Sequence, residues 1–361
     1  MTAGLQRALV YGANGYSGAL IAEEAARRGL APVLGGRNRA AVEALAHRLG
    51  LHSRVFDLDD AAAIARGLDG IDLLLNCAGP FSRTAAPLLE ACLERRVHYL
   101  DITGEIDVFA HCHRADARAR ERGIVVVPGV GFDVVPTDSV AALLKRALPD
   151  AVALVLAFEA GGGTSPGTAK TSVEGLARGG RARLGGALVD VPLAWKTRTF
   201  VRDGVERSAT TIPWGDVYTA YVSTGIPDIE VYLAMPPRAI RALRRLRLLQ
   251  PLLRFAPLRA WLEARAGARP GPDAARRAAT QCWIWGEARN AAGRVERLQI
   301  VTPNGYALTV ACALDIAAHV LAHPPTDGGY RTPSQLMGAG WVLGVPGVRV
   351  AASTFDPAAA G

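Results

Sequence analysis

The chain has 361 residues, of which half are apolar and a fifth are charged, and its formal net charge is +8. At about 150 residues per domain this length predicts two domains, and the composition excludes a disordered chain or a collagen-like repeat. No run of about 18 uncharged apolar residues occurs, so we expect no membrane-spanning helix. Five widely spaced cysteines without a C-x-x-C pair predict reduced thiols and no metal site. With no secretory signal pattern, these features predict a cytoplasmic protein.

The first third of the chain alternates short apolar strands with amphipathic helices. We expect strands at residues 8–11, 31–35, 54–56, 72–76, 98–102 and 124–127, and helices at 17–28, 39–49, 61–68, 84–95 and 108–122. Near-continuous apolar strands between helices are typical of a parallel sheet that is covered on both faces. Six such strands predict an α/β fold, a doubly wound Rossmann domain over residues 1–133.

The pattern changes after residue 133. We expect strands at residues 152–158, 217–223, 228–234, 281–287 and 295–301, and helices around 237–249 and 306–321. The last two strands flank a hairpin-like loop at 289–293, and residues 264–272 have the composition of a linker. This mixture predicts an α+β substrate and dimerisation domain over residues 134–325. A capping-box pattern at 332–335 starts one more helix, in a C-terminal tail of residues 326–361.

A glycine-rich turn follows the first strand and opens the first helix. Glycines in this context allow a tight turn and a close approach of the backbone to a pyrophosphate, which the helix N-terminus attracts. The cofactor-binding residues expected here are Gly12, Asn14, Gly15, Tyr16, Ser17 and Gly18. The alternative is a turn that serves only packing.

The second strand is followed by Arg37 and Asn38, where a site for NAD usually carries a carboxylate for the ribose 2′-hydroxyl. No Asp or Glu is near, and a guanidinium pairs well with a 2′-phosphate. We therefore expect NADP(H) as the cofactor. The alternative is that Arg37 is an ordinary solvated loop residue.

Small and polar residues follow the later strands, at the edge where doubly wound sheets bind ligands. The expected cofactor contacts there are Cys77, Ala78, Gly79, Pro80, Thr103 and Gly104, and the expected substrate contacts are Phe81, Glu105 and Phe132. Asp133 is expected to act as a catalytic residue or to cap a helix, and the sequence favours neither role.

These motifs resemble the saccharopine dehydrogenase-like oxidoreductases, and most of all their bacterial branch of trans-acting enoyl reductases. The resemblance is carried by residues 12–18, 36–37, 76–81, 99–105 and 129–138, and it continues at 163–172, 271–277, 285–287 and 302–306. It implies a Rossmann domain, an interrupting substrate domain and a C-terminal helix that returns to the first domain. It does not imply one substrate, because family members act on different C–N and C–C bonds.

An apolar acyl or enoyl substrate fits the aromatic residues of the second domain better than a charged amino acid does. Those residues include Trp195, Trp214, Trp283 and Trp285, each of which could instead be core. Enoyl reduction needs a hydride on Cβ, a donor to the carbonyl and a proton for Cα. The candidate donors are Thr164, Thr168, Lys170 and Ser172, with Tyr306 as another possible acid. Of these, Thr164 and Thr168 are expected substrate contacts, and Lys170 and Tyr306 are expected catalytic residues alongside Asp133. The alternative is that the hydroxyl groups only cap helices.

One segment holds the positive charge of the chain. Eleven arginines and two acids lie between Arg238 and Arg277, which gives this segment a charge of +9 and the remainder −1. A basic amphipathic helix there could bind an anionic membrane, an acidic carrier protein or the phosphates of coenzyme A, or it could simply be a solvated face over a core stripe. Nucleic acid is not expected as a partner, because no reading motif accompanies the patch. A homodimer is compatible with the second domain.

The sequence therefore predicts an NADP-dependent oxidoreductase that transfers a hydride in a cleft between two domains. The favoured reaction is the reduction of a C=C bond in a hydrophobic or acyl-type substrate. The alternatives are C–N redox on an amino-acid-like substrate and a non-catalytic NADPH-binding sensor at a membrane surface. The expected location is cytoplasmic, including the periphery of a membrane.

Overall fold

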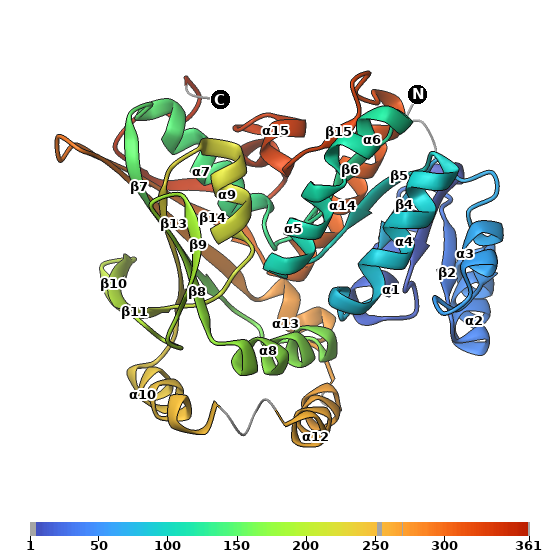
Figure 1. The fold of residues 1–361 in the computed structure, drawn as a ribbon, viewed down its shortest axis with the longest axis horizontal. Coiled ribbons are helices and arrows are strands. Elements are labelled where there is room, and N and C mark those ends of the chain that lie inside the picture. The colour runs from blue at the N-terminus through green and yellow to red at the C-terminus, as the bar shows by residue number, and fades with distance from the viewer. Residues whose placement is uncertain (1–4, 251–254, 269, 360–361) are drawn as a thin grey trace. The chain divides into compact units, whose positions relative to one another are not determined.

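The computed structural model describes residues 5–250, 255–268 and 270–359, and it divides into two compact units (Figure 1). Unit 1 comprises Met1–Asp133 and Tyr306–Pro333, and unit 2 comprises Val134–Gly305 and Ser334–Gly361. This division differs from the predicted one at its C-terminal end. Residues 306–333 belong with the first unit, and the residues from 334 onward are grouped with the second.

Unit 1 is built on a parallel seven-stranded sheet in the order β15-β6-β5-β4-β1-β2-β3. The strands are β1 (Ala8–Tyr11), β2 (Val33–Gly36), β3 (Ser53–Val55), β4 (Leu73–Asn76), β5 (His98–Asp101), β6 (Val125–Val127) and β15 (Gly329–Tyr330). The central strands are buried along their whole length, as expected for a sheet covered on both faces. The predicted doubly wound Rossmann fold is confirmed, with β15 as a seventh strand that the sequence did not indicate.

Helices form two groups around this sheet. The helices of unit 1 are α1 (Tyr16–Arg27), α2 (Arg39–Leu49), α3 (Ala61–Gly67), α4 (Phe81–Arg95), α5 (Ile106–Arg114), α6 (Asp116–Arg122) and α14 (Gly305–Ala322). Ion pairs join α1 to α2 and to α14, through Arg48–Glu23 and Arg28–Asp315, and another joins α6 to α4. The right-handed crossover rule places the two groups on opposite faces. The single helix expected at 108–122 is in fact two helices that meet at Ala115.

Helix α14 explains why residues 306–325 belong to unit 1. It is the one helix among the described residues that is long and apolar enough to cross a membrane, by length and composition only. Half of that stretch is buried within the protein, including Leu308, Cys312 and Ile316. Its partner Arg28 lies on α1, and Thr309 Oγ1 accepts a hydrogen bond from the Phe132 N–H at 2.9 Å. The helix therefore buries its apolar surface in the first unit.

Unit 2 contains a mixed sheet whose main path runs β10-β11-β12-β7-β13-β14-β16. The strands are β7 (Ala151–Ala160), β10 (Thr197–Arg202), β11 (Val205–Thr211), β12 (Asp228–Ala234), β13 (Gln281–Asn290), β14 (Val295–Pro303) and β16 (Arg349–Ser353), and β8 (Gly180–Leu184) and β9 (Ala187–Val191) branch from β12. Helix α7 (Val135–Ala147) lies against β13, where a Cβ at Gly286 would be 2.3 Å from Val140 Cγ1. The predicted hairpin at 289–293 is present between β13 and β14.

Three expectations for unit 2 are wrong. Residues 217–223 form helix α9 (Asp216–Thr224) rather than a strand, because Val217, Ala220 and Thr224 are buried at helical spacing despite their neighbours' strand propensity. Residues 264–267 are the end of helix α12 (Ala256–Gly267) and not a linker. The strands β8 to β11 were not expected at all. Helix α10 (Pro237–Leu246) and a 3₁₀ turn (Arg247–Leu249) account for the helix expected around 237–249.

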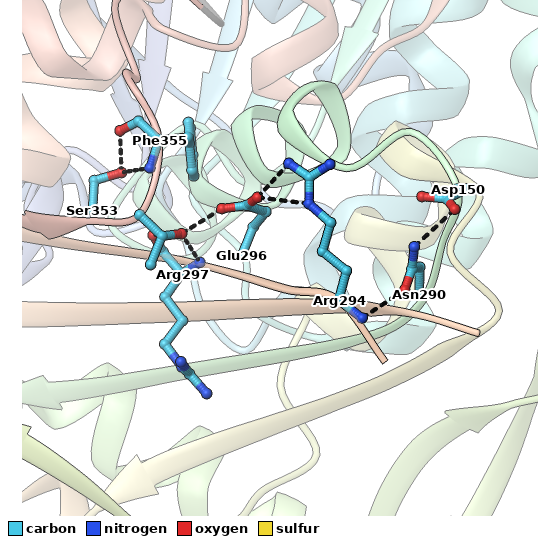
Figure 2. Close-up of polar contacts among 8 residues, drawn as sticks. Asp150, Asn290, Arg294, Glu296, Arg297, Ser353 and Phe355 are labelled. Atoms are coloured by element: carbon cyan, nitrogen blue, oxygen red, sulfur yellow. Dashed lines mark hydrogen bonds and ion pairs between the residues drawn. The ribbon is translucent and has the colours of Figure 1, made fainter. Parts of the chain in front are cut away.

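The tail joins unit 2 through β16 and the polar contacts shown in Figure 2. The Glu296 carboxylate on β14 accepts hydrogen bonds from the Arg294 guanidinium at 2.7 and 3.1 Å and from the Thr354 hydroxyl. The backbones of Arg297 and Thr354 add a further bond at 3.0 Å. The short helix α15 (Pro333–Met337) begins at the predicted proline, and the Ser334 N–H donates to Asp138 of α7 at 2.8 Å. These contacts are why the tail stays with unit 2.

Candidate functional site

Two loops at the carboxyl ends of β1 and β4 are packed in direct contact. Gly12 has φ +79°, and a Cβ there would lie 2.7 Å from the Ala78 nitrogen. A Cβ at Gly18 would lie 2.3 Å from the Gly12 carbonyl oxygen and 2.9 Å from Ala13 Cα. Both positions therefore require glycine, the first for its backbone conformation as well. The turn leaves the loop backbone close to the start of α1, as a pyrophosphate site requires.

The N-terminus of α1 has no side-chain cap. Its N-cap residue is Gly15, which has no side chain to accept a hydrogen bond from the first N–H groups of the helix. By contrast, α2 and α3 are capped by the side chains of Asn38 and Asp60. Gly15 and Asn14 are exposed. The first N–H groups of α1 and its positive dipole end are consequently available to an anion such as a diphosphate.

The end of β2 places a cation beside this turn. Arg37 is exposed, and within the described residues its guanidinium makes no hydrogen bond or ion pair with a carboxylate. The Tyr11 hydroxyl nearby donates to the Phe56 carbonyl at 3.1 Å, and burial together with Asp57 raises the pKa of Tyr11 to about 12. Asn38 instead accepts from the Ala41 N–H at 3.2 Å, so its side chain caps α2 rather than reaching toward a ligand.

A buried hydrogen-bond network ties the ends of β4, β5 and β6 together. Tyr99 Oη donates to Asp101 Oδ2 at 2.9 Å, and Asn76 Nδ2 donates to Tyr99 Oη at 3.4 Å. Asp101 Oδ1 accepts from the N–H groups of Thr103 at 3.0 Å and Gly129 at 2.9 Å. Burial raises the pKa of Asp101 to about 6, opposed by these hydrogen bonds. The network fixes three strand ends, and sequence reasoning did not identify Tyr99 or Asp101 as members of the site.

The next loop uses its polar groups internally. The Thr103 hydroxyl accepts from the Glu105 N–H at 3.0 Å, and both residues are buried. The Glu105 carboxylate accepts from the N–H groups of Phe81 at 2.8 Å and Ser82 at 2.9 Å, which are the first of α4. Glu105 is thus the cap of α4. This geometry argues against the predicted substrate role of Glu105 and for a role in positioning Phe81, which is partly exposed.

Asp133 differs from its acidic neighbours. Within the described residues its carboxyl group makes no hydrogen bond or ion pair, although a Cβ at Gly104 would lie 3.2 Å from it. Burial alone raises the pKa of Asp133 to about 7. It follows β6 and does not cap the next helix, α7, whose N-cap is Val134. A carboxylic acid that is close to half-protonated at neutral pH can hold and release a proton.

The remaining predicted residues of unit 1 surround the same edge. The Cys77 thiol is buried, which raises its pKa far above the ordinary value, so it is a packing residue rather than a nucleophile. The Ala78 backbone accepts from Thr84 at 2.6 Å and donates to Asn76 at 3.0 Å. Gly79 is exposed and Pro80 partly so. Tyr306, on the first turn of α14, meets Tyr16 edge to face with 4.9 Å between the ring centroids.

The four candidates of unit 2 lie around the start of helix α8 (Pro166–Arg178), where the Ser172 hydroxyl donates to the Thr168 carbonyl at 2.8 Å. Ser165 is the cap of this helix, and its Oγ lies 3.0 Å from Thr168 Oγ1, which commits the Thr168 hydroxyl to the cap. Thr164 and Lys170 are exposed. The Lys170 side chain lies against α12, since a Cβ at Gly267 of that helix would be 2.2 Å from Lys170 Cε. This position disfavours the predicted catalytic role of Lys170.

The tryptophans expected to line a substrate site are mostly core. Trp283 and Trp285 are both 7% exposed and pack with Tyr232 and Val301 on one face of the sheet. The Trp285 indole N–H donates to the Val201 carbonyl at 3.0 Å. Trp214 packs on Phe158, with 5.2 Å between their rings. Their spacing in the sequence did not distinguish a core cluster from a ligand site.

Comparisons with known proteins agree with this geometry. Residues 8–127 match the family model of the saccharopine dehydrogenase NADP binding domain. The chain is 28% identical over 150 residues to the mouse saccharopine dehydrogenase-like oxidoreductase, covering 36% of this chain and 35% of that protein. It is 31% identical over 157 residues to the trans-acting enoyl reductase of Mycobacterium ulcerans, covering 39% and 36% respectively. The alignments thus span just over a third of these two curated relatives.

The fold has a solved counterpart over nearly the whole chain. Apo saccharopine dehydrogenase (L-Glu forming) of Saccharomyces cerevisiae matches with a TM-score of 0.65 and 11% identity, covering 96% of this chain and 99% of that one. At that identity the match shows a shared fold. The family model confirms the prediction of an NADP-binding domain, and the glycine turn and α1 of that domain are the residues described above. The chain therefore carries a saccharopine dehydrogenase NADP-binding domain at residues 8–127, and its resemblance to the saccharopine dehydrogenase-like oxidoreductases is confirmed.

Proposed function

We propose that this protein is an NADPH-dependent oxidoreductase that reduces a C=C bond in a hydrophobic or acyl-type substrate. The observation that carries the proposal is the uncapped N-terminus of α1 beside the Gly12 turn, with the Arg37 guanidinium at the end of the neighbouring strand. Together they offer N–H groups for a diphosphate and a cation for one further phosphate. The Cβ positions of Gly12 and Gly18 show that this turn would not fold the same way with larger residues.

The preference for NADP(H) over NAD(H) depends on charge. The residues from Gly35 to Arg39 contain no acid, and the nearest one, Glu43, is 2.7 Å from the Arg39 guanidinium. The loop after β2 therefore contains no carboxylate of its own to hold a ribose 2′-hydroxyl or to repel a 2′-phosphate. Arg37 would hold that phosphate as a charge-assisted pair, while the first turn of α1 would hold the diphosphate.

The choice of a C=C bond is supported by a relative. The trans-acting enoyl reductase of Mycobacterium ulcerans aligns with 39% of this chain at 31% identity, compared with 36% at 28% identity for the mouse saccharopine dehydrogenase-like oxidoreductase. The tryptophan cluster of unit 2 does not support this choice, because Trp283 and Trp285 are core. The proposal for the substrate consequently rests on the relative and on the proton chemistry of Asp133.

The side chains of unit 1 suit a reduction that needs one proton. When bound, NADPH supplies the hydride that adds to one carbon of the double bond. The Asp133 carboxyl group, with its pKa near 7, would give a proton to the adjacent carbon and recover it from water. The Asp101 network would hold the strand ends on which this acid depends, through the bond from the Gly129 N–H at 2.9 Å. Thr103 and Glu105 would keep the loop before α5 in place.

Cofactor titrations test the first part of the proposal. We expect Arg37→Gln to weaken NADPH binding about tenfold or more, as the loss of one charge-assisted contact implies, and to leave NADH binding nearly unchanged. Arg39→Gln is the matched control, since Arg39 is exposed on the same turn but pairs with Glu43. Tighter binding of NADH than of NADPH to the unaltered protein would refute the assignment of Arg37.

Substrate assays test the second part. NADPH oxidation with 2-enoyl thioesters of increasing chain length should be faster than with charged amino acids or keto acids. Turnover only with amino acids and NADP⁺ would instead establish C–N redox, the second reaction found in the family. Binding of NADPH with no turnover on either panel would refute an enzymatic role and favour a sensor.

A further inference from the structure

Helix α10 presents arginines that have no acidic partner. Arg238, Arg241 and Arg245 are exposed, and within the described residues none of them forms an ion pair or a hydrogen bond. Exposed arginines on other helices differ, for example Arg39 with Glu43 and Arg118 with Glu90. No Asp or Glu occurs between residues 231 and 262. The positive charge of α10 is therefore not neutralised within its own stretch of the chain.

The opposite side of α10 is fixed to the body of unit 2. Ile240 is buried, and Arg244 Nε donates to the Ala194 carbonyl at 3.3 Å. Arg247 donates to the carbonyls of Leu193 at 2.5 Å and Ala194 at 2.6 Å. At 100° per residue, Arg238, Arg241 and Arg245 fall within about 60° of one another on the other face. Two arginines thus anchor the helix, and three point their charge to solvent in a fixed direction.

Large apolar side chains are exposed directly after this helix. Leu248 is 85% exposed, Leu249 52%, Phe255 64% and Trp261 58%. Val201 and Val205 on the β10–β11 hairpin, at 54% and 52%, are the only other large apolar residues of the described chain that exceed half exposure. Leu248 and Leu249 adjoin α10, and Phe255 and Trp261 belong to the next described segment of the same unit. Exposed apolar side chains of this size mark surfaces that meet another apolar phase.

Helix α12 carries the aromatic part of this surface. It packs against α8 in unit 2 (Figure 1), where the Lys170 side chain lies next to Gly267. Trp261 remains exposed, and the Arg265 guanidinium lies 5.7 Å from its ring centroid. Arginine beside an exposed tryptophan is typical of a side-chain set that lies at the level of lipid headgroups.

We propose that α10, the Leu248–Leu249 turn and the exposed residues Phe255 and Trp261 bind the surface of a membrane that contains anionic lipids. The arginines would pair with headgroup phosphates, and the leucine and aromatic side chains would enter the boundary with the acyl chains. An acidic carrier protein would pair with the arginines, but the apolar side chains of Leu248, Leu249, Phe255 and Trp261, each more than half exposed, call for a wide apolar environment as well. A lipid surface supplies both groups, so the observations favour lipid. This proposal does not depend on the oxidoreductase activity.

Vesicle binding by the full chain tests the proposal. We expect flotation with equimolar phosphatidylcholine and phosphatidylglycerol vesicles and little with phosphatidylcholine alone. Raising the salt from about 0.15 M to about 1 M shortens the Debye length from about 8 Å to about 3 Å and should release most of the protein. Acyl chains brominated near the headgroup should quench tryptophan emission, and this quenching should be largely lost in Trp261→Phe.

Two variants and one control distinguish binding through this surface from a general effect of the protein's positive charge. The triple variant Arg238→Gln, Arg241→Gln, Arg245→Gln should bind anionic vesicles more than tenfold more weakly, since each arginine near such a surface contributes about fivefold. Leu248→Ser with Phe255→Ser should weaken binding without altering its salt dependence. The control variant replaces three exposed arginines that form ion pairs, and it removes the same amount of charge: Arg27→Gln, Arg48→Gln and Arg118→Gln.

The outcomes are distinct from those of the function tests. NADPH titration of each variant should match the unaltered protein, which shows that the chain is folded. Equal vesicle binding by the triple variant and the control would overturn the proposal. So would binding of an acidic acyl carrier protein through the same arginines without any binding to anionic vesicles. If the unaltered protein did not bind NADPH, the proposed function would be refuted, but the vesicle result would stand.

Discussion

Gly18→Ala should damage the nucleotide turn even though alanine is the better helix former. Gly18 lies inside α1 and is buried. In a helix interior the exchange by itself stabilises by about 1 kcal/mol. The added Cβ, however, would lie 2.3 Å from the Gly12 carbonyl oxygen, about 1.1 Å closer than the 3.4 Å at which ordinary contact begins. Forced overpacking of this kind costs about 1–3 kcal/mol, so the net effect should be neutral to destabilising by about 2 kcal/mol.

The same clash should weaken cofactor binding. The Gly12 carbonyl accepts from the Gly15 N–H at 2.9 Å, so a shift of that carbonyl moves the turn that precedes α1. Loss of one charge-assisted contact to a phosphate costs about 1.5–3 kcal/mol, which is a factor of about 10 to 150 in the NADPH dissociation constant.

Gly175→Ala in α8 is the matched control for this experiment. Its Cβ would meet no atom of the described residues within 4 Å, so it should stabilise and leave NADPH binding unchanged. Thermal unfolding by circular dichroism and NADPH titration by calorimetry measure both effects. If Gly18→Ala stabilised the protein as Gly175→Ala does and kept its NADPH affinity, the packed turn could not be the cofactor site.

Two further predictions concern the acidic residues of unit 1. Asp133→Asn should lower turnover of an enoyl substrate about 10²-fold or more and remove the fall in kcat/KM that we expect above pH 7. Because the raised pKa of Asp133 lowers the stability of the folded protein as pH rises from about 4 to about 7, the variant should also unfold at a higher temperature than the unaltered protein at pH 8. An unchanged pH profile of kcat/KM would refute Asp133 as the acid. Glu105→Gln should lower stability by about 1 kcal/mol, because an amide has one oxygen and loses one of the two hydrogen bonds that the carboxylate accepts from the start of α4. Glu94→Gln on the same helix is the control, and a raised KM at unchanged stability would restore the substrate role of Glu105.

The first unit could be predicted from sequence because its signals are local. Residues 8–11 and 39–49 coincide with β1 and α2. Buried strands are short apolar runs, and turns between them carry glycine or a capping side chain. The strand β15 escaped notice because it has two residues, Gly329 and Tyr330, and is held by pairing with β6 and by the Asp116 carboxylate. Such an edge strand has no pattern of its own.

The second unit was less predictable because its partners are distant in the sequence. The α9 segment is rich in valine and tyrosine, and only its packing against α7 and β12 makes it helical. In the β10–β11 hairpin, residues of β10 alternate between exposed and partly buried positions, and Arg202 pairs with Glu159 of β7 across 43 residues. Its strands become recognisable once those pairs are known. The tail was misplaced for the same reason, since β16 is exposed along its length and depends on contacts with Glu296 and Arg297.

The site shows the same contrast between local and distant signals. The glycine turn and Arg37 could be proposed from sequence because their expected chemistry follows from neighbours in the chain. Glu105, Thr168 and Lys170 looked similar as isolated polar residues. In the structure, however, Glu105 caps α4, the Thr168 hydroxyl bonds to the capping Ser165, and Lys170 lies along α12. What separates Asp133 from them is the lack of any cap or ion pair in the described part of the chain, together with burial that raises its pKa. Asp133 is therefore an acid that the fold does not use for capping or ion pairing. For this reason, rather than for its place in a motif, we propose Asp133 as the proton donor.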